Sequence, residues 1–163
     1  MIYTHGDVLQ THLKFIAHQV NCKGVMGRGL AKQISDTYPG VLDLYKNYIN
    51  KYYEEHGYSP LGTAFCTYVG CDCDDSEQCI INIFGQEGFG TDRQYTDYNA
   101  VRKAFEDFYI DYRYNTGSDS QLVIAIPYGF GCGLGGGRWD KMEEVLKDIE
   151  NNYNIEFVVY KQN

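Results

Sequence analysis

The sequence predicts an α/β fold in which a sheet lies between helices on both of its faces. Segments with the length and apolar character of strands alternate along the chain with segments of helical periodicity. One strand candidate, "QLVIAIP" at residues 121–127, is almost continuously apolar, which is typical of a strand covered on both faces. No repeat, low-complexity tract or Pro/Ser-rich linker appears, so residues 1–163 are expected to form a single domain.

The first half of the chain predicts two helices and three strands. A strand is expected at residues 13–20, and a helix from Leu30 to the breakers Pro39 and Gly40. A second helix is expected at residues 41–57, and its apolar face would carry Val41, Tyr45, Tyr48 and Tyr52. Strands follow at residues 63–69 and 79–85, on either side of an acidic turn.

The second half predicts a helix from about Asp97, capped by Thr96, then the strand at 121–127. A last helix begins near Trp139, and a strand at 155–160 closes the chain. The residues expected on the buried sides of these two helices are Val101, Phe105, Phe108 and Tyr112 in the first and Met142, Leu146 and Ile149 in the second.

The overall charge and the terminal sequence exclude some classes of protein. A net charge of -8 argues against a protein that binds nucleic-acid backbones, because such a protein needs a clustered basic surface. No apolar run approaches the roughly 20 residues of a membrane span, so no membrane partner is expected. The opening "MIYTHGDVLQ" lacks the pattern of a signal peptide, which makes a cytoplasmic protein the simplest expectation.

Four of the six cysteines fall within "CTYVGCDCDDSEQC", at residues 66–79. Zinc sites usually contain cysteines in C-x2-C pairs, and this run does not. We therefore expect reduced thiols on a solvated acidic hairpin and no metal site, although the cysteine cluster keeps zinc as an alternative.

Two glycine-rich loops follow predicted strands. "NCKGVMGRG" (21–29) comes after the strand at 13–20 and leads into a helix, while "YGFGCGLGGG" (128–137) comes after the strand at 121–127. In open α/β sheets, ligands bind where strand-to-helix loops gather, and free N–H groups at a helix start favour an anion. The two loops therefore predict a site for a ligand with a diphosphate. The P-loop and the G-x-G-x-x-G dinucleotide fingerprint are both absent.

The segments "HQVNCKGVMGRGLAKQI" (18–34) and "IPYGFGCGLGGGRW" (126–139) resemble the macrodomain family, which binds ADP-ribose and its derivatives. The resemblance runs from "GDVL" (6–9) to "VVY" (158–160) and implies a three-layer α/β/α fold with a central mixed, mostly parallel sheet. The first motif is most similar to the branch that processes ADP-ribose 1″-phosphate, close to the terminal- and DNA-ADP-ribose hydrolase macrodomains.

The resemblance also implies which residues contact the ligand. Asp7 would accept a hydrogen bond from the adenine amino group, with Val8 beside it and Tyr160 flanking the ring, and Asn21 would contact the distal ribose. The residues implied to line the diphosphate are Gly27, Arg28, Gly29 and Leu30 on one side and Gly131, Cys132, Gly133, Leu134 and Gly135 on the other.

His18 is the candidate catalytic residue, since the matching histidine in that branch belongs to the active site and imidazole suits acid–base work. It would orient or activate water, or protonate the departing sugar oxygen; a purely structural histidine is the alternative. His5, His12 and His56 are expected at the surface. In the segment 84–100, Gln86 and two tyrosines, Tyr95 and Tyr98, suggest either a loop over the ligand or simple packing.

Departures from the family pattern narrow the expected reaction. Gly135 stands where lysine–aspartate hydrolases carry aspartate, and "NIFGQEG" supplies no lysine. The paired-asparagine motif of another hydrolase class is also missing. The expected function is binding of ADP-ribose or a derivative and its hydrolysis, led by ADP-ribose 1″-phosphate phosphatase activity without metal or cofactor. The alternatives are a non-catalytic reader, a sink for an NAD-derived signalling nucleotide, or removal of ADP-ribose from a macromolecule.

Overall fold

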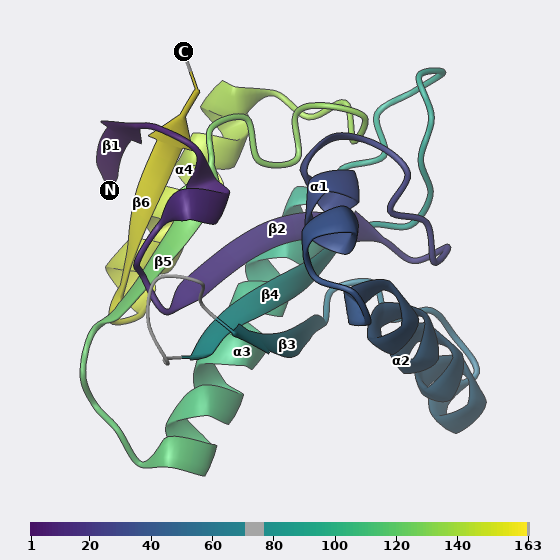
Figure 1. Cartoon of the computed structure of the whole chain (residues 1–163), viewed down its shortest axis with the longest axis horizontal. Helices are drawn as coiled ribbons and strands as arrows, with labels where there is room; N and C mark the ends of the chain where they lie inside the picture. Colours follow the sequence, from purple (N-terminus) through teal and green to yellow (C-terminus); the bar gives the residue numbers. More distant parts are fainter. Residues whose placement is uncertain (71–76, 163) are drawn as a thin grey trace.

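Across residues 1–70 and 77–162, which the computed structural model describes, the chain forms one six-stranded sheet (Figure 1). All neighbouring strands run parallel except β3, which is antiparallel to β4. This confirms the mixed, mostly parallel sheet. The strands, in their order across the sheet, are β1 (Ile2–His5), β6 (Ile155–Lys161), β5 (Leu122–Pro127), β2 (Phe15–Asn21), β4 (Glu77–Gln86) and β3 (Ala64–Gly70).

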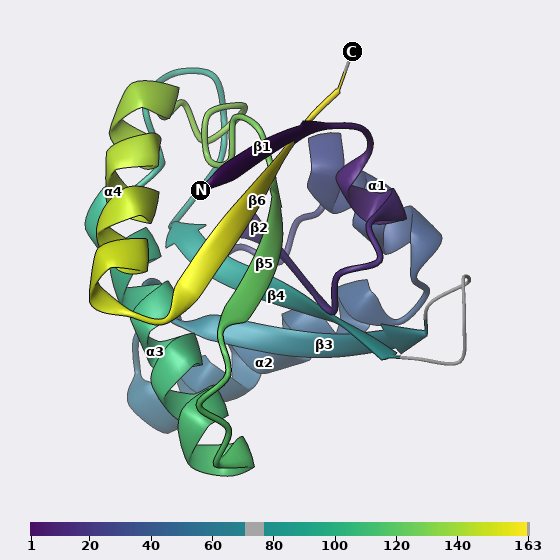
Figure 2. The ribbon, with the colours of Figure 1, turned by 90° about the vertical axis from the view of Figure 1, so that its left-hand side faces the viewer.

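Four α-helices cover the two faces of the sheet in pairs (Figure 2). α1 (Gly29–Thr37) and α2 (Val41–His56) lie on one face, and α3 (Tyr98–Thr116) and α4 (Trp139–Asn152) lie on the other. A short 3₁₀ helix, η1 (Val8–Gln10), connects β1 to β2. The predicted three-layer α/β/α arrangement is therefore confirmed.

Strand β2 shows how the sequence builds a core on each face. Phe15 and Ala17 belong to the hydrophobic cluster under α3 and α4, whereas Ile16 and Val20 belong to the cluster under α1 and α2. Successive side chains of a strand point to opposite faces, so an apolar strand without polar alternation is buried on both sides. β2 is therefore a central strand, and its last residues can place side chains deep inside the molecule.

Two elements near the N-terminus were not predicted. β1 is four residues long, lies at the edge of the sheet and is largely exposed, so its residues lack a core-facing apolar pattern. η1 begins where the Asp7 side chain accepts a hydrogen bond from the Leu9 amide (2.9 Å).

The prediction that Thr96 caps α3 was wrong. The Asp97 side chain accepts the hydrogen bond from the Ala100 amide (3.0 Å), and Asp97 is the N-cap residue. Thr96 is buried and its hydroxyl bonds to the Gly131 carbonyl instead. In α2 the buried residues are Val41, Tyr45 and Ile49, because the helix turns its Ile49 side toward the sheet and leaves Tyr52 outside the core. The predicted acidic turn, with Cys71 and Cys73, lies outside the described residues.

The sheet opens between β2 and β5. These parallel strands pair at Phe15–Ile124 and Ile16–Ala125, near the start of β2, and have no further paired positions toward their carboxyl ends. The chain winds outward from this point in both directions, toward β4 and β3 on one side and β6 and β1 on the other. Such a switch point is where open α/β sheets bind ligands.

Candidate functional site

The opening between β2 and β5 leads into a cavity of about 700 Å³, called here the main cavity. Its walls are the two glycine-rich loops, the start of α1 and the segment that follows β4. The sequence-predicted site residues that line it are His18, Asn21, Gly27, Arg28, Gly29, Leu30, Gly131, Gly133, Leu134 and Gly135. Both glycine loops thus face the same space.

A second cavity of about 390 Å³ adjoins the main one and shares Gly29, Leu30, Pro127 and Tyr128 with it. Of the four remaining predicted residues, Asp7, Val8 and Tyr160 line this second cavity. The structure therefore brings segments from both ends of the chain to two cavities that share part of their lining. Whether each of these residues contacts a ligand remains a prediction.

Cys132 departs from the predicted arrangement, because it is not among the residues that line either cavity. Its thiol donates to the Phe130 carbonyl (3.4 Å), and the side chain packs against the core under α3 and α4. Burial raises the pKa of Cys132 to about 11, and burial likewise raises that of Cys22 to about 12. Both thiols are protonated at neutral pH, so neither fits the part of a nucleophile.

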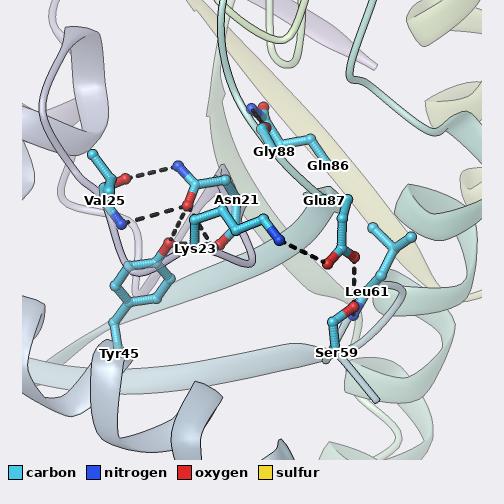
Figure 3. Close-up of polar contacts among 9 residues, drawn as sticks. All are labelled: Asn21, Lys23, Val25, Tyr45, Ser59, Leu61, Gln86, Glu87 and Gly88. Atoms are coloured by element: carbon cyan, nitrogen blue, oxygen red, sulfur yellow. Dashed lines mark hydrogen bonds and ion pairs between the residues drawn. The ribbon is translucent and has the colours of Figure 1, made fainter.

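Asn21 holds the first glycine loop in shape (Figure 3). Its Oδ1 accepts hydrogen bonds from the amides of Lys23 (2.9 Å) and Val25 (3.4 Å), and its Nδ2 donates to the Val25 carbonyl (2.8 Å). The hydroxyl of the fully buried Tyr45 lies 2.5 Å from the Asn21 carbonyl oxygen and 2.9 Å from its Oδ1. Asn21 therefore shapes the wall of the main cavity, a role that the sequence did not reveal.

A second set of contacts ties this loop to the segment after β4 (Figure 3). The Cys22 amide donates to the Glu87 carbonyl (3.0 Å), and the Lys23 ammonium lies 3.6 Å from the Glu87 carboxylate. Ser59 donates to the other carboxylate oxygen (2.5 Å). The backbone bond is the stronger constraint, since an exposed ion pair contributes little to stability.

His18 lies in the interior of the molecule, at 2% exposure, and lines the main cavity. Its Nε2 is 2.7 Å from Oδ1 of Asn82, and its Nδ1 is buried without a partner among the described residues. Burial lowers the pKa of His18 to about 4, against a smaller opposing effect of the Asn82 hydrogen bond. The imidazole is neutral at neutral pH. A neutral ring does not suit the role of protonating a leaving group, but it can orient a water molecule. His5, His12 and His56 are exposed, as predicted.

Sequence analysis missed a network of three polar side chains, the Gln19 network (Gln19, Gln86 and Thr96). Gln19 Nε2 donates to Gln86 Oε1 (2.7 Å) and Thr96 Oγ1 (2.8 Å), and Thr96 donates to the Gly131 carbonyl (2.6 Å). Gln86 in turn donates to the Gly88 carbonyl (2.8 Å). The network joins the ends of β2 and β4 to the second glycine loop. Gln19 and Thr96 are far apart in sequence, so no local pattern signals their contact.

The segment after β4 covers the main cavity with residues other than the expected tyrosines. Phe89, Gly90 and Thr91 line the cavity, whereas Tyr95 and Tyr98 do not. The Tyr95 hydroxyl donates to Asp92 (2.6 Å), and the Tyr98 hydroxyl accepts from the Arg138 amide (2.8 Å). The packing alternative therefore holds for both tyrosines, and the exposed Phe89 takes the position beside the cavity.

Arg28 is the one charged side chain among the described residues that line the main cavity, and none of them is a carboxylate. It is also the N-cap residue of α1 and makes no side-chain cap hydrogen bond, so the first-turn amides there keep their capacity to bind an anion. Over residues 1–70 and 77–162, no three His, Cys, Asp or Glu side chains gather closely enough to hold a metal ion. No helix within these ranges is long and apolar enough to cross a membrane.

Comparisons with known proteins agree on the fold. No family model matches the chain. The ADP-ribose 1″-phosphate phosphatase of Scheffersomyces stipitis is 26% identical, over 97% of this chain and 97% of that protein.

Among solved structures, the macrodomain of Mycobacterium tuberculosis DarG superposes with a TM-score of 0.72 at 24% identity, covering 98% of this chain and 95% of that one. Thermosipho africanus DarTG in complex with ADP-ribose gives a TM-score of 0.74 at 18% identity, covering 98% of this chain and 40% of that longer chain. The resemblance drawn from the two glycine-rich motifs is thus confirmed at the level of structure: the chain has the macrodomain fold.

Proposed function

We propose that this protein binds ADP-ribose or a derivative in the two adjoining cavities and hydrolyses it, with ADP-ribose 1″-phosphate as the leading substrate. The observation that carries the proposal is the convergence of both glycine-rich loops on one cavity at the switch point of the sheet. The similarity to a phosphatase of that substrate and to an ADP-ribose-bound macrodomain structure supports the choice of ligand.

The two cavities divide the ligand between them. The adenine would lie in the second cavity, with Asp7 accepting from its amino group and Val8 and Tyr160 beside the ring. The diphosphate would lie between the loops, near the uncapped start of α1 and the Arg28 guanidinium. Backbone amides and one cation suit a diphosphate without requiring a basic surface. The distal ribose would then face Asn21 and His18.

His18 is the proposed catalytic residue. As a buried, neutral imidazole it would orient a water molecule or a ribose hydroxyl at the far end of the ligand, rather than donate a proton. A second candidate, a non-catalytic reader or a sink for an NAD-derived nucleotide, is favoured by one observation: none of the described residues that line the main cavity is a carboxylate or a lysine. Binding alone needs no such group.

Removal of ADP-ribose from a macromolecule is a third candidate. The net charge of -8 counts against a nucleic-acid carrier, because phosphate backbones bind to clustered lysine and arginine. A salt-dependent affinity for DNA would favour this candidate over the others.

Calorimetry with ADP-ribose and phosphate release from ADP-ribose 1″-phosphate test the proposal together. The wild type should bind and release phosphate, and His18→Ala should bind but release at least about a hundredfold less, as expected when the group that accepts a hydrogen bond from the reacting water or hydroxyl is lost. His12→Ala removes an exposed histidine and serves as the matched control. Binding without release from the wild type would leave the reader or sink, and absence of binding would refute the proposal.

A further inference from the structure

A chain of buried hydrogen bonds crosses from the edge strand β3 to His18 in β2. Its middle member is Asn82, a fully buried residue of β4 that stands directly opposite His18 in the strand register. Asn82 Nδ2 donates to the Phe65 carbonyl (2.9 Å) and contacts Thr67 Oγ1 (3.1 Å), both on β3. Asn82 Oδ1 lies 2.7 Å from His18 Nε2.

The Phe65 carbonyl fixes the donor and the acceptor in each hydrogen bond of this series. A carbonyl oxygen only accepts, so the amide group of Asn82 must turn its NH₂ toward β3 and its oxygen toward His18. An amide oxygen also only accepts, so His18 Nε2 must carry the proton of this hydrogen bond. The other ring nitrogen, Nδ1, is then left with a lone pair and has no partner among the described residues.

We infer that Asn82 is a positioning residue that holds His18 as the neutral tautomer protonated at Nε2, so that Nδ1 accepts a hydrogen bond from a ribose hydroxyl or a water molecule in the main cavity. The inference rests on the proposed function, which puts the distal end of the ligand beside His18. It adds which ring nitrogen is free to accept a hydrogen bond and which residue decides this.

The surroundings of His18 agree with an acceptor and not with a cation. Burial lowers the pKa of His18, the Asn82 hydrogen bond opposes this with a smaller effect, and no charged side chain contributes. The neighbours on the same face of the sheet, Ile16, Val20 and Ile80, are apolar. An amide at position 82 fixes the tautomer without supplying the negative charge that would favour an imidazolium.

The test is nitrogen NMR of the His18 ring in wild type and in Asn82→Asp, with and without ADP-ribose. The wild type should show the Nε2–H tautomer, and its Nδ1 resonance should move when ADP-ribose is added. In Asn82→Asp the carboxylate beside Nε2 should raise the midpoint of the His18 titration by about one pH unit or more. The acid limb of phosphate release should move by the same amount.

Gln78→Glu is the matched control for the charge change. Gln78 is another buried amide of β4, but it lies near the start of the strand and donates to the carbonyls of Thr11 and Leu13. This variant should lose stability as Asn82→Asp does and leave the His18 titration unchanged.

Each outcome bears on one of the two proposals. An Nδ1–H tautomer in the wild type, or an unmoved His18 midpoint in folded Asn82→Asp, would overturn the inference even where ADP-ribose binds. The wild-type spectrum needs no variant, so a failure of Asn82→Asp to fold would not remove the test, and Asn82→Ser should then give a mixture of tautomers. The predicted tautomer in a protein that does not bind ADP-ribose would support the role of Asn82 and refute the proposed function.

Discussion

At the scale of single residues, the wall of the main cavity depends on positions that leave no room for a side chain. A Cβ atom at Gly135 would lie 2.3 Å from Thr96 Oγ1 and 2.8 Å from the Gly131 carbonyl oxygen. The amides of Tyr95 and Thr96 both donate to the Gly135 carbonyl (2.7 and 2.8 Å). The second glycine loop is therefore packed directly on Thr96. A methyl group at position 135 must displace either the loop or the Thr96 side chain.

Gly135→Ala should lower the melting temperature by several degrees, because forcing a methyl group into a packed site costs about 1–3 kcal/mol. It should also weaken ADP-ribose binding, since the loop must move. Gly133→Ala is the control, as nothing lies within 4 Å of a Cβ at that position. Differential scanning calorimetry of both variants measures the difference, and equal melting temperatures would contradict the packing argument.

The burial of His18 predicts how the free energy of unfolding depends on pH. Its pKa falls from 6.5 in the unfolded chain to about 4 in the folded protein. Below pH 6.5 the unfolded chain therefore binds a proton that the folded protein does not, so the free energy of unfolding is highest above pH 6.5 and falls as the pH is lowered toward 4. This residue alone should cost about 2 kcal/mol between pH 7 and pH 5.

Urea unfolding at pH 7 and pH 5 measures that cost. His18→Gln, which does not titrate, should lose less stability over the interval than the wild type, and the exposed His12→Gln should behave like the wild type. Parallel losses in wild type and His18→Gln would show that burial does not hold the ring neutral.

At the scale of elements, the segment between β4 and α3 shapes one side of the site. Gln86 donates to the Gly88 carbonyl, and Tyr95 donates to Asp92 while the Arg93 guanidinium lies over its ring (4.7 Å to the centroid). These contacts brace the loop between β4 and α3, in which Phe89 is 46% exposed. An exposed aromatic side chain on a braced loop beside a cavity is suited to cover a ligand.

Phe89→Ala should weaken ADP-ribose binding about fivefold and leave the melting temperature unchanged, because a half-exposed phenyl ring loses about 1 kcal/mol of contact only when the ligand is present. Leu44→Ala, at 49% exposure on α2 and away from both cavities, is the matched control. An affinity loss as large for Leu44→Ala, or none for Phe89→Ala, would remove Phe89 from the site.

The elements that the sequence predicted well are those whose pattern is local. The apolar run before Pro127 marked β5, and the periodicity of Met142, Leu146 and Ile149 marked α4. β1 was missed because this short edge strand forms by pairing with β6, at the far end of the chain, and leaves no local pattern in the sequence. The α3 cap was misplaced by one residue since Thr96 and Asp97 are both good caps, and a distant carbonyl on Gly131 engages Thr96.

At the scale of the whole molecule, one sheet separates two hydrophobic clusters. Side chains from β2, β4 and β5 enter both clusters, so neither side can lose its packing without exposing the other face of the same strands. This arrangement favours a single cooperative unit, in line with the proposal that residues 1–163 form one domain.

Urea unfolding should accordingly be two-state. Trp139, the one tryptophan of the chain, lies at the start of α4 and reports on one layer, whereas far-UV circular dichroism reports on all helices. The two signals should share one midpoint, and a clear separation of the midpoints would divide the chain into independently stable parts.

The sequence predicted the parts of the candidate site that lie on glycine-rich loops. Both glycine loops were predicted from the sequence, because glycine-rich strand-to-helix connections at a sheet edge have a local signature. His18 was predicted from its place near the end of a strand and from the family resemblance. Asn82, Gln19 and Phe89 were not, since their importance lies in partners that only the folded chain brings close. The buried state of His18 also depends on packing that no spacing of residues encodes.

The crowding around Gly135 limits how this protein can evolve. Lysine–aspartate chemistry would need aspartate at that position, yet the first atom of any side chain there meets Thr96, Gly131 and Gln19 at 2.3 to 2.9 Å. Aspartate at this position therefore requires smaller residues in place of Thr96 and Gln19 and also a shift of the Gly131 backbone, whose carbonyl no substitution removes. A single substitution at position 135 is therefore not enough to introduce that chemistry.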